Sequence, residues 1–214
     1  MRVILGSSSK WRRALAKEHL GLDVELLPAD IDEKKIAHES NPKTPEEHTL
    51  VIAKAKLDHL LSMISSDPKR DERPVIIICC DTIVYYNGEI LEKPIDHEDC
   101  VRMIKLWGKK GCRTEIYTAT AVGSVDGPKD HPRIISLSDV ERSDVVMTRD
   151  LQDNEIENYI SKSDCIKSSG AVIVEDLMDI NSAVIDGDRT VIEGLPIKGV
   201  QKMMDEIKSK INSK

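Results

Sequence analysis

Six consecutive apolar residues, Val75 to Cys80, constrain the fold of this chain more than any other segment. Both faces of this strand-length run are apolar, which is typical of a central strand in a sheet that helices cover on both sides. The run ends at Asp81 and Thr82. Because ligands of open α/β sheets bind beyond the carboxyl ends of strands, Asp81 is a candidate metal ligand or general base. The alternative is an aspartate that caps a turn.

Strand-like and helix-like segments alternate through the first half of the chain. This alternation predicts an α/β fold with a partly parallel sheet. The polar run from Ser65 to Arg73 is expected to be a connector. The predicted strands are Val3 to Leu5, Val24 to Leu27 and Val75 to Cys80, and the predicted helices are Lys10 to His19 and Pro45 to Met63.

The second half of the chain begins with a predicted hairpin, in which Asn87-Gly88 is a strong type I′ turn signal between Ile83 to Tyr86 and Ile90-Leu91. Two longer β-like runs, Thr114 to Val125 and Ile134 to Thr148, are expected to form a hairpin outside the first sheet. Further helices are predicted at His97 to Trp107, Asp153 to Ile160 and, on three- and four-residue apolar spacing, Val200 to Ile211.

Composition limits the classes of function. With 214 residues, of which 40% are hydrophobic, the chain is expected to form a single domain spanning residues 1–214. A net charge of −7 argues against a general nucleic-acid binder, which needs a broad basic face. The sequence lacks a run long enough to cross a membrane, and its start is too short for a secretory signal, so we expect a cytoplasmic protein. The five cysteines lack zinc-like spacing and are interpreted as small buried residues.

A candidate anion site lies in the segment from Leu5 to Arg13 (LGSSSKWRR). A strand that passes through a Gly/Ser turn into a helix aims free backbone N–H groups and the positive end of the helix dipole at one point. Serine hydroxyls and arginine side chains can complete such a phosphate cradle. The alternative is a serine N-cap on an amphipathic helix with solvated charges.

Acidic and basic residues elsewhere could act with this cradle. Asp30, Asp32 and Glu33 form an acidic cluster after the second strand, and carboxylates from two segments can jointly hold Mg²⁺ or Mn²⁺. Lys54 and Lys93 are candidate point charges for phosphates. The alternatives are a solvated acidic loop and ordinary surface lysines.

Several short motifs are found along the chain in a fixed order. They are Ser7-x-Ser9-x-x-Arg12-Arg13, Asp32-Glu33, Lys54-Ala55, Cys80-Asp81-Thr82, Gly88 to Pro94, Tyr117-Thr118, Ser169-Gly170 and Gly194-Leu195-Pro196. In this order they closely resemble the Maf family of nucleoside triphosphate pyrophosphatases, over nearly the whole chain. The resemblance implies an inosine-triphosphatase-like α/β fold, with an elongated mixed β-sheet flanked by helices and a cleft between two lobes.

The resemblance also implies a reaction, its cofactor and its residues. Members of the family hydrolyse a nucleoside triphosphate to the monophosphate and diphosphate with a divalent cation, Mg²⁺ or Mn²⁺, and homodimers occur among them. Asp81 matches the general base, and Glu33 helps it to hold the metal. The side chains implied to bind the triphosphate are Ser7, Ser9, Arg12, Arg13, Lys54 and Lys93.

Base specificity rests on three positions. Trp11 stands where the thymidine and uridine triphosphate enzymes typically have arginine, and it resembles the 7-methylguanosine triphosphate branch. An indole face attracts the cationic methylated guanine by stacking and cation–π interaction. Glu175 matches the acidic position of that branch and could accept hydrogen bonds from the guanine N1–H and N2–H₂ edge. Thr82, by contrast, resembles the thymidine and uridine branch, so both substrate classes stay open.

Two other classes of function stay open on sequence grounds. A non-catalytic nucleotide-binding regulator would keep the pocket without turnover, although such a protein has no need of acids beside phosphates. A soluble interaction domain would require each of these motifs to be structural. Release of diphosphate from a nucleotide separates the enzyme from both alternatives.

Overall fold

The computed structural model describes residues 1–67 and 74–213 and divides the chain into two compact units. The first unit consists of Met1–Asp81, Thr118–Glu141 and Glu193–Lys214. The second consists of Thr82–Tyr117 and Arg142–Ile192. Of the predicted connector from Ser65 to Arg73, residues 68–73 lie outside the described residues.

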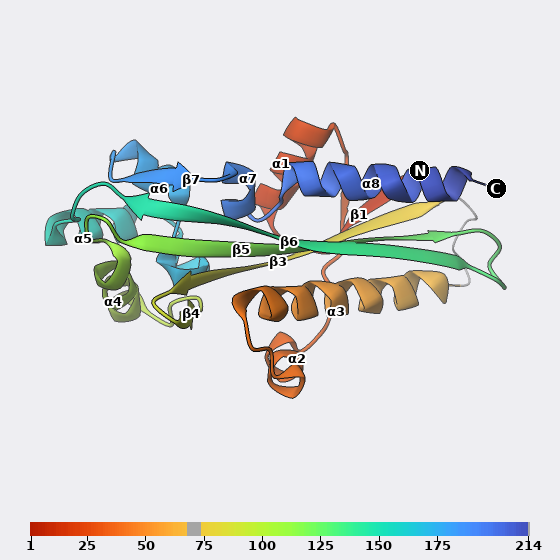
Figure 1. Cartoon of the computed structure of the whole chain (residues 1–214), viewed down its shortest axis with the longest axis horizontal. Helices are drawn as coiled ribbons and strands as arrows, with labels where there is room; N and C mark the ends of the chain where they lie inside the picture. Colours follow the sequence, from red (N-terminus) through yellow and green to blue (C-terminus); the bar gives the residue numbers. More distant parts are fainter. Residues whose placement is uncertain (68–73, 214) are drawn as a thin grey trace. The chain divides into compact units, whose positions relative to one another are not determined.

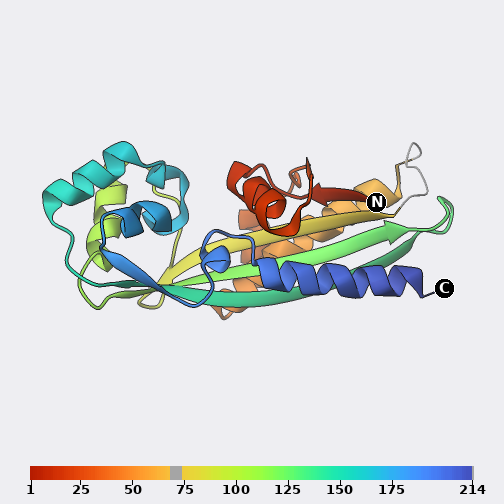
Figure 2. The same cartoon turned by 90° about the horizontal axis from the view of Figure 1, so that it is seen from above.

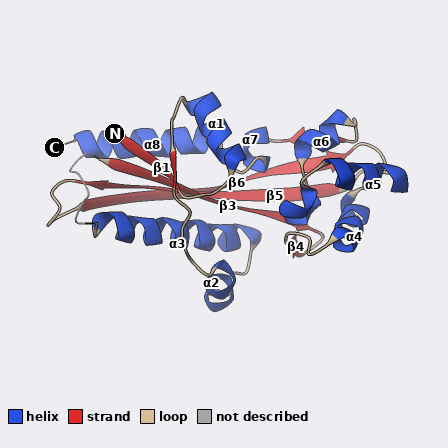
Figure 3. Cartoon of the chain, turned by 180° about the vertical axis from the view of Figure 1, so that it is seen from behind, coloured by secondary structure: helices blue, strands red, loops and turns tan. Residues whose placement is uncertain are grey.

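Among the described residues, seven strands form one mixed sheet in the order β2-β1-β3-β5-β6-β7, with β4 paired to β3. Strand β1 (Arg2–Leu5) is parallel to both β2 (Glu25–Leu26) and β3 (Val75–Tyr86), which confirms the partly parallel sheet. The predicted hairpin is confirmed as well: β3 pairs antiparallel with β4 (Glu89–Leu91), and Asn87 and Gly88 both have positive φ, 50° and 91°. The predicted end of the apolar strand at Cys80 was wrong, because β3 continues through Asp81 to Tyr86. Figure 3 distinguishes these strands from the helices.

The placement of the second predicted hairpin was wrong. Strands β5 (Arg113–Asp126) and β6 (Arg133–Met147) belong to the same sheet as β3, and β6 pairs antiparallel with β7 (Ala183–Asp186). The physical reason is burial: β5 is buried continuously from Ile116 to Asp126. A strand covered on both faces belongs in the middle of a layered sheet, so β5 lies within the sheet and not outside it.

Helices cover both faces of the sheet within the first unit (Figure 1). Ile76 and Ile78 of β3 pack in one core with residues of α1 (Lys10–Leu20) and α8 (Ile197–Asn212). Ile77 and Cys79 point the other way and pack with α3 (Pro45–Ser65). Figure 2 shows α8 lying along the strands. The two apolar faces of the Val75 to Cys80 run therefore have the two helical covers that the sequence predicts.

Helix α2 (Glu33–Ser40) is a feature that the sequence reasoning missed. Its N-cap is Asp32, whose Oδ1 accepts a hydrogen bond from the backbone N–H of Lys35 at 3.0 Å. The acidic cluster after the second strand is therefore the start of a helix, which stabilises negative charge through its dipole.

The second unit has its own apolar core, built on the fully buried Trp107 at the end of α4 (His97–Trp107). The indole Nε1 donates to the backbone oxygen of Gly170 at 2.9 Å, and the Tyr159 hydroxyl donates to that of Ala171 at 2.8 Å. The remaining elements of this unit are α5 (Asp153–Lys162), the 3₁₀ turns Cys165–Lys167 and Ser169–Ala171, α6 (Val174–Asp179) and α7 (Arg189–Ile192).

Four of the five cysteines are buried, as the sequence predicts, and Cys112 is half-buried. Burial raises the pKa of the Cys79 thiol to about 12, so the thiolate form is disfavoured at neutral pH. Within the described residues, no helix has the length and apolar character that crossing a bilayer requires.

Candidate active site

The turn between β1 and α1 forms one side of the candidate site. Gly6 continues the sheet by donating its N–H to the backbone oxygen of Ile78 at 2.8 Å. A Cβ at Gly6 would lie 2.4 Å from the Cys79 sulfur, so only glycine fits against β3 here. Ser7 then accepts a hydrogen bond from the Ser9 N–H at 3.1 Å. The chain therefore enters α1 through a tight hydroxyl-lined turn directly beside β3.

Ser9 is the N-cap of α1, and its Oγ accepts from the Arg12 N–H at 3.3 Å. The capping interpretation of this serine is therefore confirmed. The first turn of α1 also carries Arg12, whose Nη1 donates to the backbone oxygen of Cys80 at 3.0 Å. This contact brings the guanidinium to the residue that precedes Asp81.

The other two predicted residues of this turn face outward. Trp11 has 70% of its surface exposed, the largest exposure of an aromatic side chain among the described residues. Arg13 is also exposed and forms a loose ion pair with Asp23, with 3.8 Å between Nη2 and Oδ1. Trp11 therefore presents an open aromatic face next to the serine turn.

Asp81, Lys56 and Glu33 form an ionic cluster in the first unit. The Lys56 Nζ lies 2.8 Å from Asp81 Oδ1 and 3.1 Å from Glu33 Oε1. The Lys56 and Asp81 side chains are each 12% exposed, whereas that of Glu33 is 50% exposed. One ammonium thus joins a buried acid of β3 to an accessible acid at the start of α2.

Lys56 is the residue that the sequence reasoning missed. Lys54, the predicted lysine, is exposed and lines a pocket of about 420 Å³ together with Asp58 and Ser136. A helical signal was present in the sequence: Lys56 lies four residues after Ile52 and four before Leu60, and both of these are buried. A lysine between two core positions points along the core-facing side of the helix.

Three predicted residues belong to the second unit. Thr82 follows Asp81 in β3 and is half-buried, and Lys93 is exposed just beyond β4. Glu175 lies in the first turn of α6, where its Oε1 is 3.2 Å from Nη2 of Arg189. The carboxylate that was predicted to bind the guanine edge is therefore paired with an arginine in this structure.

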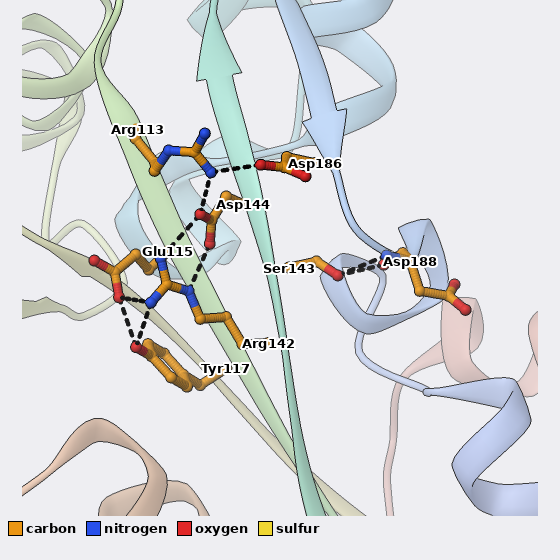
Figure 4. A network of polar contacts seen from close by, with 8 residues as sticks. All are labelled: Arg113, Glu115, Tyr117, Arg142, Ser143, Asp144, Asp186 and Asp188. Carbon is orange, nitrogen blue, oxygen red and sulfur yellow. Dashed lines mark hydrogen bonds and ion pairs between the residues drawn. The ribbon is translucent and has the colours of Figure 1, made fainter.

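A second polar network was not predicted from the sequence (Figure 4). The buried Asp144 accepts two hydrogen bonds from Arg142, at 2.8 and 2.9 Å, and one from Arg113 at 2.6 Å. Arg142 also lies over the ring of Tyr117, with 5.6 Å between its Cζ and the ring centroid. Burial alone would raise the pKa of Asp144, but hydrogen bonds from Arg142 and Arg113 outweigh burial and hold it below its usual value. The network joins β5 to β6.

Glu33 and Asp81 fit a divalent metal ion by the chemistry of their donor atoms. Their oxygens come from two different elements and converge on a single cationic nitrogen. Hard ions such as Mg²⁺ prefer oxygen ligands and are often held by one or two carboxylates together with substrate phosphates. In the part of the chain that the structure describes, no group of three or more His, Cys, Asp or Glu residues could hold a metal. The pair therefore suits an ion that shares its coordination with a phosphate.

Comparison with known proteins identifies a family and several relatives. The family model described as Maf-like protein matches residues 2–207. A 7-methyl-GTP pyrophosphatase of Dictyostelium discoideum is 29% identical over 206 residues, which cover 96% of each chain. A dTTP/UTP pyrophosphatase of Pyrococcus furiosus is 32% identical over 205 residues, covering 95% of this chain and 94% of the relative. A solved dITP/XTP pyrophosphatase of Mycobacterium abscessus, 15% identical, covers 70% of this chain and 75% of its own, with a TM-score of 0.30.

Proposed function

Because the chain belongs to the Maf-like protein family, we propose that it is a nucleotide pyrophosphatase that converts a nucleoside triphosphate and water to the monophosphate and diphosphate. The observation that carries the proposal is the meeting of Asp81, Lys56 and Glu33 within 2.8 to 3.1 Å, with Arg12 bound to the carbonyl that precedes Asp81. Acids and cations are thus gathered around Asp81, in the middle of the largely buried strand β3, and this arrangement suits attack on a phosphoanhydride.

The proposed reaction needs water to attack the α-phosphorus while the bond to the bridging oxygen breaks. Asp81 is proposed to accept the proton of the attacking water, since it is a carboxylate whose side chain is only 12% exposed, at the centre of the ionic cluster. The electron pair of the broken bond leaves with the diphosphate. Arg12, Lys56 and Lys93 are the proposed cations that offset this negative charge, and Ser7 and Ser9 line the turn beside it.

The proposed cofactor is a divalent cation, Mg²⁺ or Mn²⁺, which Glu33 and Asp81 would hold. When bound, it would supply positive charge to the phosphate oxygens. The half-exposed side chain of Glu33 supports the assignment, because a ligand to a metal that enters with substrate needs to be accessible.

The proposed substrate is 7-methylguanosine triphosphate. Trp11 supports this choice, because an indole that is 70% exposed offers a free face for a cationic base. A dTTP/UTP pyrophosphatase is the second candidate, which Thr82 and the similarity to relatives of that name favour. In that case Glu175 would stay paired with Arg189 when the nucleotide binds and would not contact the base.

As part of the same proposal, residues 1–214 act as one catalytic domain on a dissolved nucleotide in the cytoplasm. The match of the family model over residues 2–207 supports a single functional domain. The net charge of −7 supports a small anionic ligand, bound by a local cationic cluster, over nucleic acid.

The test is diphosphate release from a panel of nucleoside triphosphates with Mg²⁺ or Mn²⁺. We expect release with 7-methylguanosine triphosphate at the highest kcat/KM, and absence of release from every nucleotide would refute the enzymatic proposal. Tight nucleotide binding without product would favour the non-catalytic regulator. Replacing Trp11 by Ala should reduce kcat/KM for the methylated nucleotide more than for UTP, whereas Trp11→Phe, which keeps a ring, should retain part of the difference.

A further inference from the structure

Lys56 occupies the place that the proposed metal requires. Its Nζ lies 2.8 Å from Asp81 and 3.1 Å from Glu33, distances at which an ammonium neutralises both carboxylates. The Lys56 and Asp81 side chains are each only 12% exposed, so water screens the contact between them weakly. Those two acids cannot accept a dication at the same contact distance while the ammonium remains between them, because two cations so close would repel strongly.

We propose that Lys56 is an internal competitor of the divalent metal, whose ammonium holds Glu33 and Asp81 in the metal-free protein and leaves them when the ion binds. The inference rests on the proposed function in one respect, namely that these two carboxylates are the metal ligands. Lys56 thereby becomes a residue that sets the metal affinity of the site, in addition to carrying a positive charge.

The competition links metal binding to nucleotide binding. A lysine ammonium sits on a flexible four-carbon chain and binds phosphate as a point charge, so a displaced Lys56 can move its charge to a phosphate oxygen. A triphosphate that attracts Lys56 frees the carboxylates for the metal, and a metal that displaces Lys56 frees a cation for the triphosphate. By linkage, each ligand then raises the affinity for the other by the same factor.

If Lys56 competes with the metal, removing its ammonium should raise the affinity of the protein for the metal. Binding of Mn²⁺ alone, without nucleotide, is measured on the full chain from the loss of the free-ion electron paramagnetic resonance signal. We expect Lys56→Met to bind Mn²⁺ about tenfold more tightly than the unsubstituted protein, because the ion no longer has to displace an ammonium.

Lys54 provides the matched control on the same helix. Lys54→Met removes the same charge two residues away from Lys56, but Lys54 is exposed and lines the pocket with Asp58 and Ser136. We expect its Mn²⁺ affinity to change by less than about threefold, since exposed charges are screened. Lys56→Arg retains the positive charge and should keep Mn²⁺ binding weak.

The possible outcomes test the competition separately from the assignment of the metal ligands and from the enzymatic activity. Equal or weaker Mn²⁺ binding by folded Lys56→Met, or an equal gain in Lys54→Met, would overturn the competition. If circular dichroism shows that Lys56→Met does not fold, Lys56→Gln replaces it under the same criterion. Should Glu33→Gln leave the Mn²⁺ affinity of the protein unchanged, the assignment of the metal ligands fails, while diphosphate release still tests the enzymatic activity independently.

Discussion

Asp144 and Asp186 form a natural matched pair for measuring what burial adds to an ion pair. Both accept from the same nitrogen, Nη1 of Arg113, at 2.6 and 2.7 Å. The Asp144 side chain is 6% exposed and also binds Arg142, whereas that of Asp186 is 65% exposed. The distance to Arg113 is therefore almost constant, while solvent access differs about tenfold and Asp144 has a second arginine partner. We predict that the two Asp→Asn substitutions differ widely in their effect on stability.

The size of the stability loss depends on how exposed the arginines are that lose their partner. Removing one partner from a fully buried ion pair costs about 3–5 kcal/mol. The arginines that Asp144 binds are 44–46% exposed and regain some hydration when it is lost, so we expect Asp144→Asn to lower the free energy of unfolding by about 2–3 kcal/mol. Asp186→Asn should change it by less than about 0.5 kcal/mol, as is typical of surface pairs.

The assay is urea unfolding followed by circular dichroism at pH 7 and again at pH 3. Because the folded pKa of Asp144 lies below its unfolded value of about 3.9, its contribution is complete above that value and declines as pH falls through the folded pKa. The difference between the unsubstituted protein and Asp144→Asn should therefore shrink at pH 3. Equal effects of the two substitutions at pH 7 would refute the burial argument.

Three further changes test the site and its support. Asp81→Asn should reduce diphosphate release by at least about a hundredfold while the circular dichroism spectrum is retained, and an active variant would exclude Asp81 as the base. Gly6→Ala should destabilise the protein by about 1–3 kcal/mol in urea unfolding, because the new Cβ would overlap the Cys79 sulfur; an unchanged midpoint would contradict that packing. Tyr159→Phe should lower stability by about 1–3 kcal/mol, since its hydroxyl joins Ala171 and Ile173, and a neutral result would show that water replaces it.

Local patterns predicted most of the elements because the residues that decide them are close in sequence. The helix over α3 begins at its predicted proline, and its N-cap Thr44 accepts from the Glu47 N–H at 3.2 Å. The Asn87-Gly88 turn was equally predictable, since its backbone conformation depends on those two residues. Helix α2 was missed because its apolar stripe is weak: it has no buried residue.

Only long-range packing decided the parts that local patterns could not. Whether β5 and β6 join the first sheet depends on what covers their faces, and this information lies in helices far away in sequence. The Arg113, Arg142 and Asp144 network likewise depends on strand register, which sets which side chains meet.

The order of residues was enough to predict that an acid follows an apolar strand segment, that a serine turn begins a helix, and that the motifs resemble one family. The structure shows that β3 continues past that acid to Tyr86. The tertiary structure decided which lysine reaches that acid. Lys54 and Lys56 are two residues apart on one helix, yet a helix turns by about 100° per residue, so they point in widely different directions. Lys56 meets Asp81 and Glu33 because α3 packs on β3 in one particular rotation, and that rotation is set by the shared core.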